Sequence, residues 1–246
     1  MPTTGSQTAP LQPRLRFTLR TLLLGVTVFC VWLGIHAHRA REQKKLVEEI
    51  QKNIGSVSYD YENWNAPPGQ RGESWVPRWL RERLGVDFFH TIKQVHTRER
   101  KLLPRIAQLS SLTELEIWDH ELTDEDLEPL RGHSRLKALR VASDLHATLS
   151  GDYPDTTLLG DPSLALVGKL PALEEVALDG YHFTGKGLVD LAKSRSLRSI
   201  YVDHCDETVQ PSAIEPFRDA ERVDRLWIRK WVEHQGDVDL AQWGRW

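Results

Sequence analysis

The sequence predicts an α/β fold in which repeated strand–helix units stack into a solenoid behind one N-terminal transmembrane helix. Three observations predict it. A six-residue phrase with apolar residues at positions 1, 4 and 6 recurs along the body, and a phrase with helical spacing follows most of its copies. Near the N-terminus, fifteen consecutive residues carry no charge. Together they indicate a membrane anchor joined to a body of stacked units.

The composition of the 246 residues excludes several classes of protein. Apolar residues make up 40% and charged residues 27%, which is typical of a folded chain, and two cysteines cannot form a disulfide framework. The net charge of −3 argues against a nucleic-acid partner. The charge is uneven, because residues 1–45 hold seven basic side chains and one acid (+6), which leaves −9 for the rest. A basic, apolar head on an acidic body indicates a membrane anchor with a soluble domain.

The anchor is predicted over residues 14–38, behind a disordered tail of small and polar residues over 1–13. The uncharged run of residues 21–35 would be about 23 Å long as a helix, which is short of a bilayer core. Extension to residues 17–37 gives about 31 Å and includes one charge. That charge, Arg20, lies near the end of the span, where its long side chain can reach the headgroups.

Two alternatives to an uncleaved anchor stay open, a cleaved signal peptide and a buried core helix. The site Ile35-His36-Ala37 is a poor match to a signal-peptidase site, and basic residues flank both ends of the apolar run. Three Lys or Arg residues precede the span and four follow it closely, so the positive-inside count is nearly tied. A short tail before the span and a long domain after it favour a single-pass membrane protein with an extracytoplasmic body.

Two segments are expected to connect the anchor to the repeats. Residues 39–55 are predicted to form a juxtamembrane helix with an apolar stripe of Leu46, Ile50 and Ile54, ended by Gly55. Residues 56–89 are predicted to form an N-terminal cap. Within this cap we expect a strand over residues 57–61 and an amphipathic helix that begins at Pro77 and ends at Gly85.

The six-residue phrase predicts parallel strands. Its copies begin 24, 37, 24 and 26 residues apart, at Leu112, Leu136, Leu173, Leu197 and Val223, and a weaker copy begins at Ile92. The phrases that follow have the spacing of short helices. Their first residues favour helix starts, as at Thr123, at Asp161 before Pro162, and at Ser212 with Glu215 as a capping box.

This layout resembles the leucine-rich repeat family, in the form with one strand and one helix per repeat known from ribonuclease-inhibitor-like proteins. Residues 112–130 carry the closest match, and the resemblance covers roughly residues 90–228. It also extends to bacterial members with a single N-terminal span. The resemblance implies a parallel sheet on a concave side and short helices on a convex side, with less regular turns because the family's stacked asparagine is missing. We expect repeats over residues 90–230.

The last segment, residues 231–246, is predicted to be a C-terminal cap whose three tryptophans (Trp231, Trp243 and Trp246) shield the last repeat. A second irregular segment is the long unit over residues 142–161, which contains about thirteen extra residues. Long loops on rigid scaffolds often carry recognition, and simple tolerance of an insertion explains this segment equally well.

Positions 3, 5 and 7 of each predicted strand share one side of the sheet, the concave side in this family. In adjacent strands, Glu116 should face Arg140, and Asp203 should face Arg229. Tryptophan, tyrosine and arginine commonly anchor protein contacts. The alternative is a solvated surface whose charges merely pair. The candidate partner-binding residues are Glu114, Glu116, Trp118, Arg140, Asp179, Tyr201, Asp203, Arg225, Trp227 and Arg229.

Three patterns that suggest an enzyme were weighed, and we expect no catalytic, cofactor or metal site. Residues 180–186 have phosphate-loop spacing, but Gly187 stands where a Ser or Thr would bind Mg²⁺. Adjacent strand residues point to opposite faces, so His204 and Cys205 make a poor nucleophile–base pair. Of the ten histidines, His182 and His204 are the least unsuitable metal pair, and none has a recognised metal spacing.

The sequence therefore predicts a membrane-anchored interaction module that binds a protein partner through its concave face. Two other hypotheses stay open. One is a structural component of a cell envelope without a separable ligand. The other is an enzyme whose site has no recognisable sequence pattern.

Overall fold

The computed structural model describes residues 19–62, 72–119, 121–142, 159–179, 182–206, 208–218, 222–232 and 236–244. The predicted tail over residues 1–13 and most of the insertion over 142–161 lie outside this description. The strands are β1 (Ser56–Tyr59), β2 (Ile92–Thr97), β3 (Glu114–Ile117), β4 (Ala138–Val141), β5 (Glu175–Asp179), β6 (Ser199–Cys205), β7 (Arg225–Val232) and β8 (Gly236–Gly244).

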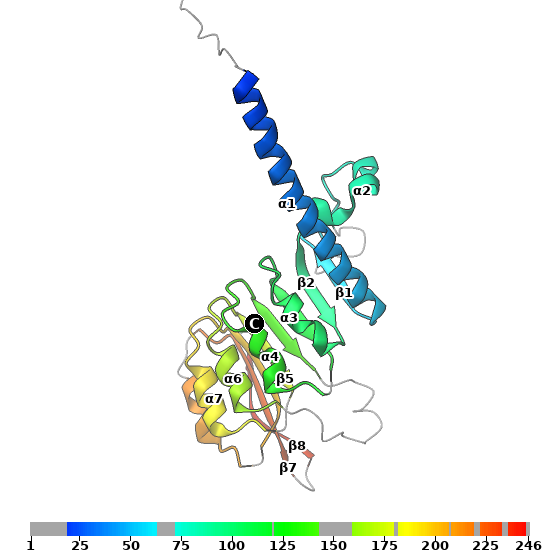
Figure 1. Ribbon diagram of the computed structural model, residues 1–246. Helices are drawn as coiled ribbons and strands as arrows, with labels where there is room; N and C mark the ends of the chain where they lie inside the picture. Colours follow the sequence, from blue (N-terminus) through cyan, green and yellow to red (C-terminus); the bar gives the residue numbers. More distant parts are fainter. Residues whose placement is uncertain are drawn as a thin grey trace, which may run out of the picture.

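The helices alternate with these strands (Figure 1). The α-helices are α1 (Leu19–Lys52), α2 (Arg78–Leu84), α3 (Leu103–Ile106), α4 (Asp124–Leu127), α6 (Asp161–Val167), α7 (Gly185–Ala192) and α8 (Glu215–Arg218). Single turns of 3-10 helix are η1 (Val86–Phe88), η2 (Arg100–Leu102), η3 (Glu128–Leu130) and η4 (Pro211–Ile214).

In the described part of the chain, the strands form one eight-stranded sheet in sequence order. Strands β2 to β7 are parallel, while β1 and β8 are antiparallel to their neighbours. The repeated phrase sets the register of the parallel strands. Its fourth position forms one column across the sheet, with every side chain at most 2% exposed: Val95, Leu115, Leu139, Val176, Ile200 and Leu226. The prediction of stacked parallel strands is confirmed.

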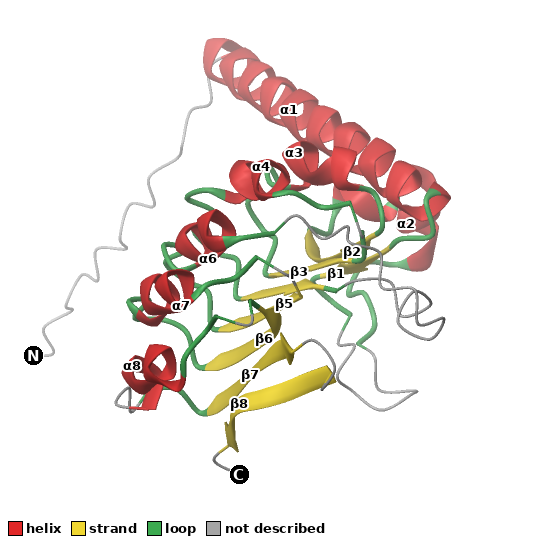
Figure 2. Ribbon diagram, turned by 90° about the horizontal axis from the view of Figure 1, so that it is seen from below, coloured by secondary structure: helices red, strands yellow, loops and turns green. Residues whose placement is uncertain are grey.

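The helices α4, α6, α7 and α8 lie along one side of the sheet, as Figure 2 shows. Each directs at least one fully buried side chain into the core, namely Leu127, Leu164, Leu188 and Phe217. These residues belong to the same apolar cluster as the strand column. The core is therefore shared by neighbouring strands and helices. The fold is α/β, with a mostly parallel sheet and short helices on one of its sides.

Two aspartates in the first turns of helices connect successive units. The Asp124 carboxylate accepts hydrogen bonds from the Gly160 and Ser163 N–H groups at 3.0 and 3.2 Å, at the start of α6. The Asp161 carboxylate accepts bonds from the N–H and hydroxyl of Thr184, at 2.8 and 2.6 Å, just before α7. Each carboxylate satisfies N–H groups that the next helix leaves unpaired, so these side chains fix the spacing between units.

The three predicted helix starts have different outcomes. At Asp161, α6 begins as predicted, with Pro162 in its first turn. Thr123 forms a capping box with Asp126 at the start of α4. The predicted box of Ser212 and Glu215 does not form. The chain already turns into η4 at Pro211, and its N-cap, Gln210, makes no side-chain hydrogen bond to the helix.

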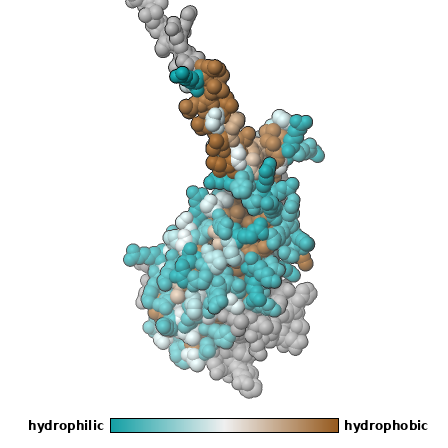
Figure 3. All heavy atoms as spheres, in the orientation of Figure 1, coloured by the Kyte–Doolittle hydropathy of each residue, from teal (hydrophilic) through white to brown (hydrophobic). Residues whose placement is uncertain are grey.

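The predicted anchor and juxtamembrane helix form one continuous helix, α1, of 34 residues. Figure 3 shows its upper half as an apolar column that stands clear of the body. Residues 19–35 are exposed, and α1 is the one helix in the described residues that is long and apolar enough to cross a membrane. The lower half packs on the body through Leu46, Val47 and Ile50, which join the core cluster.

The end of α1 differs from the prediction. Ile54 is 76% exposed and does not continue the apolar stripe, in which Val47 takes part instead. Ile54 also adopts the left-handed conformation (φ 60°) that was expected of Gly55. The Gly55 N–H donates to the Ile50 carbonyl at 2.9 Å, and a Cβ at Gly55 would lie 2.6 Å from the His96 carbonyl oxygen. Glycine is required here for close approach to β2.

The two ends of the sheet are closed by antiparallel strands. At the front, the predicted strand appears as β1, and α1 covers the core beside it. The expected cap helix forms as α2, with Pro77 as its N-cap, but it buries none of its residues. At the back, the predicted C-terminal cap contains a strand, β8, which pairs with β7 and which was not predicted. The side chains of the three tryptophans expected to shield the last repeat lie outside the description. The alternation Asp237, Val238, Asp239, Leu240 was the signal for this strand.

Candidate functional site

We use the term polar face for the side of the sheet opposite the helices. Along β3 and β5, buried residues facing the helices alternate with partly exposed residues on the polar face. The ladder places two predicted rows on this face. The first is Gln94, Glu114, Ala138, Glu175, Ser199 and Arg225, and the second is His96, Glu116, Arg140, Ala177, Tyr201 and Trp227. The strands therefore bring most of the predicted site residues onto one surface.

The part of this face over β3, β4 and β5 is acidic. Arg140 lies opposite Glu116 in the ladder, as expected. Its guanidinium, however, donates through Nε and Nη2 to Glu175 Oε1 on the other side, at 2.9 and 2.7 Å. Burial acts to lower the pKa of Arg140, but the hydrogen bonds and charge of Glu175 outweigh it and raise that pKa above its usual value. Glu116 instead accepts a bond from Trp118 Nε1–H at 2.8 Å.

A hollow of about 240 Å³ opens beside these charges. Its lining comes from β1 to β4: Ser56, Ser58, Gln94, Val95, His96, Glu114, Glu116 and Arg140. The His96 ring contacts Trp118 at 5.6 Å between centroids, and its buried Nε2 has no hydrogen-bond partner in the described part of the chain. With Arg140 already paired, Glu114 and Glu116 leave the hollow with negative charge, which suits basic or hydrogen-bond-donating groups of a partner.

The part of the polar face over β6 and β7 is aromatic. The rings of Tyr201 and Trp227 lie 5.7 Å apart at 47°, and the Tyr201 hydroxyl donates to Asp203 Oδ2 at 2.8 Å. Arg225 is exposed beside them, and Asp203 is buried in register with Asp179. A tethered tyrosine next to a tryptophan is a rigid, amphipathic surface of the kind that anchors protein contacts.

One predicted pair of this region is wrong. Asp203 does not lie opposite Arg229, because the ladder between β6 and β7 shifts register between Val202 and Cys205, so that Cys205 pairs with Lys230. Arg229 pairs instead with Asp239 of β8 in the ladder, and its side chain lies outside the description. The shift is a local irregularity that no repeat spacing reveals.

The sequence patterns that suggested an enzyme have structural explanations where they are described. A Cβ at Gly187 would lie 2.2 Å from Asp161 Oδ1, so glycine is needed for α7 to pack on α6. Residues 180 and 181 of the same pattern lie outside the description. Cys205 is buried, and burial raises the pKa of its thiol to about 12, which keeps it protonated at neutral pH. In the described residues, no group of three or more His, Cys, Asp or Glu is placed to hold a metal ion.

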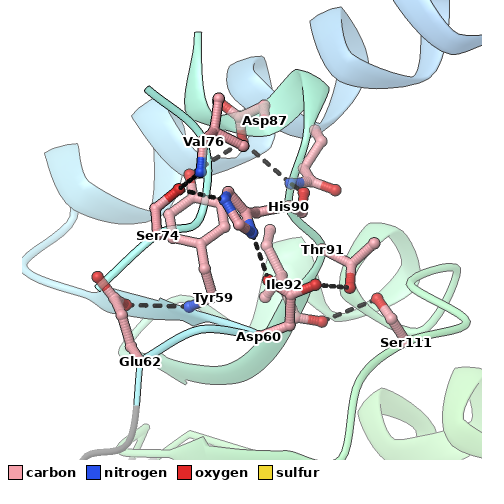
Figure 4. A network of polar contacts seen from close by, with 11 residues as sticks. Tyr59, Asp60, Glu62, Ser74, Val76, Asp87, His90, Thr91, Ile92 and Ser111 are labelled. Carbon is pink, nitrogen blue, oxygen red and sulfur yellow. Dashed lines mark hydrogen bonds and ion pairs between the residues drawn. The ribbon is translucent and has the colours of Figure 1, made fainter. Parts of the chain in front are cut away.

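A polar network that no sequence pattern indicated lies at the front of the sheet, as Figure 4 shows. The buried His90 ring lies between two partners: Nδ1 is 2.7 Å from Asp60 Oδ1, and Nε2 is 2.7 Å from Ser74 Oγ. Because the carboxylate can only accept, Nδ1–H donates to Asp60, and in the neutral ring Nε2 then accepts from the Ser74 hydroxyl. No spacing rule could have found it, because the three residues lie 14 to 30 positions apart and the fold alone unites them.

The surroundings of His90 tie this network to α1. The side chain of Gln43 on α1 donates to Asp87 Oδ1 and to the His90 carbonyl, both at 3.0 Å. Tyr59 on β1 donates to the same Asp87 oxygen at 2.9 Å. Burial, together with the negative charge of Asp87, raises the pKa of Tyr59 far above its ordinary value, so this hydroxyl stays a donor. The network therefore fixes α1 against β1 and the start of β2.

No known protein-family model matches the chain, and no curated protein matches its sequence. The class of protein is thus defined by the structure: an α/β protein with a mostly parallel sheet and one long apolar N-terminal helix.

Proposed function

We propose that this chain is a membrane-anchored leucine-rich repeat protein and that its polar face binds a protein partner. In this proposal α1 crosses the membrane once, and the body lies on the extracytoplasmic side. The parallel strands then form the concave side of a solenoid and the helices its convex side. Support comes from the single column of buried residues, which repeats from β2 to β7 in the register that stacked repeats require.

The observation that carries the binding role is the composition of the polar face. An acidic hollow lined by Glu114 and Glu116 lies at one end, and the pair of Tyr201 and Trp227 lies at the other. The strands between them are held in register by a packed core. This surface would therefore lose little conformational entropy when a partner binds. The surface thus combines charge selectivity with aromatic anchors.

The proposal is tested by crosslinking in native membranes, followed by recovery of the partner. We expect Arg225→Glu combined with Trp227→Ala to reduce the recovered complex by roughly tenfold or more, as loss of an aromatic anchor and a charge does. The matched control is Arg195→Glu, an exposed arginine on the turn after α7. Equal losses in the two variants, with both folded by circular dichroism, would reject the polar face as the binding surface. They would favour the structural component without a separable ligand.

A second candidate function rests on the order of atoms in the His90 network. Ser74 Oγ, His90 Nε2, His90 Nδ1 and Asp60 Oδ1 form the sequence of nucleophile, base and orienting acid of serine hydrolases. In such a role Ser74 Oγ would attack an acyl carbonyl and pass its proton to His90. Against it, His90 is enclosed, with the Tyr61 ring 4.4 Å from its own, and Ser74 Oγ already accepts the Val76 N–H at 3.2 Å.

A fluorophosphonate probe decides this second candidate. A hydrolase would be labelled at Ser74, and labelling would disappear in Ser74→Ala and in His90→Gln. We expect no labelling of the folded protein, because both side chains are engaged in holding the front of the sheet together. Labelling that depends on Ser74 would make the network an active site.

A further inference from the structure

The helix α2 presents an apolar surface that the protein itself does not cover. Trp75 before the helix is 77% exposed, and Trp79 and Leu84 within it are 64% and 50% exposed. No residue of α2 is buried. Tryptophan side chains of this exposure are costly in water and are enriched where membrane and water meet.

The position of α2 relative to α1 indicates what covers this apolar surface. Figure 1 shows α2 beside the middle of α1, well above the sheet. The middle of α1 is where its apolar run ends, at Ile35, and where partial burial begins, at His36 and Ala37. In Figure 3, the apolar surface of α1 reaches down to the level of α2. If α1 crosses a bilayer, α2 lies at the height of the lipid headgroups.

The charges at this level fit anionic lipid. Helix α2 carries three arginines (Arg78, Arg81 and Arg83) against one acid, Glu82. Arg78, Arg81 and Glu82 line a shallow hollow of about 440 Å³ together with Val86. Arg78 donates from Nε to Glu82 Oε1 at 2.8 Å in an exposed pair, and its terminal N–H groups remain for a phosphate. The Nε of Arg81 is buried and has no hydrogen-bond partner in the described residues. A guanidinium with an unpaired N–H group can donate a hydrogen bond to a phosphate oxygen. Arg39 and Arg41, which follow the apolar run of α1, are also exposed.

We propose that α2 is a membrane-interface helix. Trp75, Trp79 and Leu84 lie among the lipid headgroups next to the span, and Arg78 and Arg81 bind the phosphate of a phospholipid in the hollow between them. The inference rests on the proposed single span and adds a second contact with the membrane. Two contacts, one crossing the bilayer and one lying on it, would hold the body at a defined tilt and so set the direction in which the polar face points.

The test uses the full chain in vesicles of phosphatidylcholine with about one quarter phosphatidylglycerol. Cys30 is replaced by Ser, and the buried Cys205 is left in place. An NBD fluorophore is attached at Leu84→Cys on α2 or, as the matched control, at Lys186→Cys, an exposed position on α7. Quenching by lipid with a spin label near the headgroup reports contact with the membrane. We expect quenching at position 84 to exceed that at position 186 by about threefold or more.

Two further measurements separate the parts of the proposal. Arg78→Gln, Arg81→Gln and Arg83→Gln together should weaken the quenching at position 84 markedly, and an unchanged signal would overturn the assignment of phosphate to these arginines. Alkaline carbonate extraction tests the span itself. If the chain stays in the membrane but positions 84 and 186 are quenched equally, the anchor is present and the interface helix is refuted. A chain that carbonate extracts has no span, and the interface helix falls with it.

Discussion

Leu139→Ala is expected to destabilise the body by about 2–5 kcal/mol, the cost of removing a fully buried leucine from a packed core. Leu139 lies in β4, in the centre of the buried column, between Leu115 and Val176. A cavity there faces both neighbouring units at once. Because Leu139 is paired in register with a buried residue on each side, the loss is felt by both neighbouring strands.

The adjacent residue supplies the control. Arg140→Ala removes a side chain from the polar face and breaks its partly exposed pair with Glu175. Such a pair contributes about 1 kcal/mol or less, so the variant should unfold close to the wild type. Denaturation with urea, followed by circular dichroism, measures both variants. Equal destabilisation by the two substitutions would show that the alternation of faces along β4 is wrong.

Val28→Arg combined with Val31→Arg is expected to abolish stable membrane integration. Both valines are exposed in the apolar half of α1. An arginine at the centre of a span costs about 2.5–3.5 kcal/mol on insertion scales, so two of them remove most of the preference of this helix for the bilayer. The readout is the fraction of chain left in the membrane after alkaline carbonate extraction.

His38→Arg is the matched control for the span, because this exposed residue lies just after the apolar run. An arginine there lies in the headgroup region and should not reduce integration. Retention of the double variant in the membrane would contradict the anchor. An intact mass that lacks the first residues would instead show that the segment is a cleaved signal peptide.

The repeated phrase was enough to predict the centre of the fold. Apolar residues at positions 1, 4 and 6 place Leu115, Leu139 and Val176 on the same side of successive strands, and the ladder aligns them. This is so because a strand that slipped by one residue would turn its apolar side to water. The rows of the polar face follow from the same alternation, which is why Tyr201 and Trp227 could be predicted as neighbours.

The ends of the stack could not be predicted in the same way. The sequence suggested that α2 covers the first strands, whereas Leu46 and Ile50 of α1 do so and α2 stays exposed. An amphipathic pattern indicates that a helix has an apolar side but not what that side contacts. The sequence also could not show which carboxylate pairs with Arg140. Carboxylates lie on both neighbouring strands, and the guanidinium bonds to Glu175.

The sequence by itself determined the register of the parallel strands β2 to β7, the residues in them that face the core, and the place of the apolar run in α1. These properties depend on residues close together in the chain, whose periodicity is visible in one dimension. The tertiary structure decided what is brought together across the chain, as in the bond from His90 to Asp60 and Ser74, or the bond from Asp161 to Thr184. Such contacts join residues between 16 and 30 positions apart, and only the packing of the folded chain brings them together.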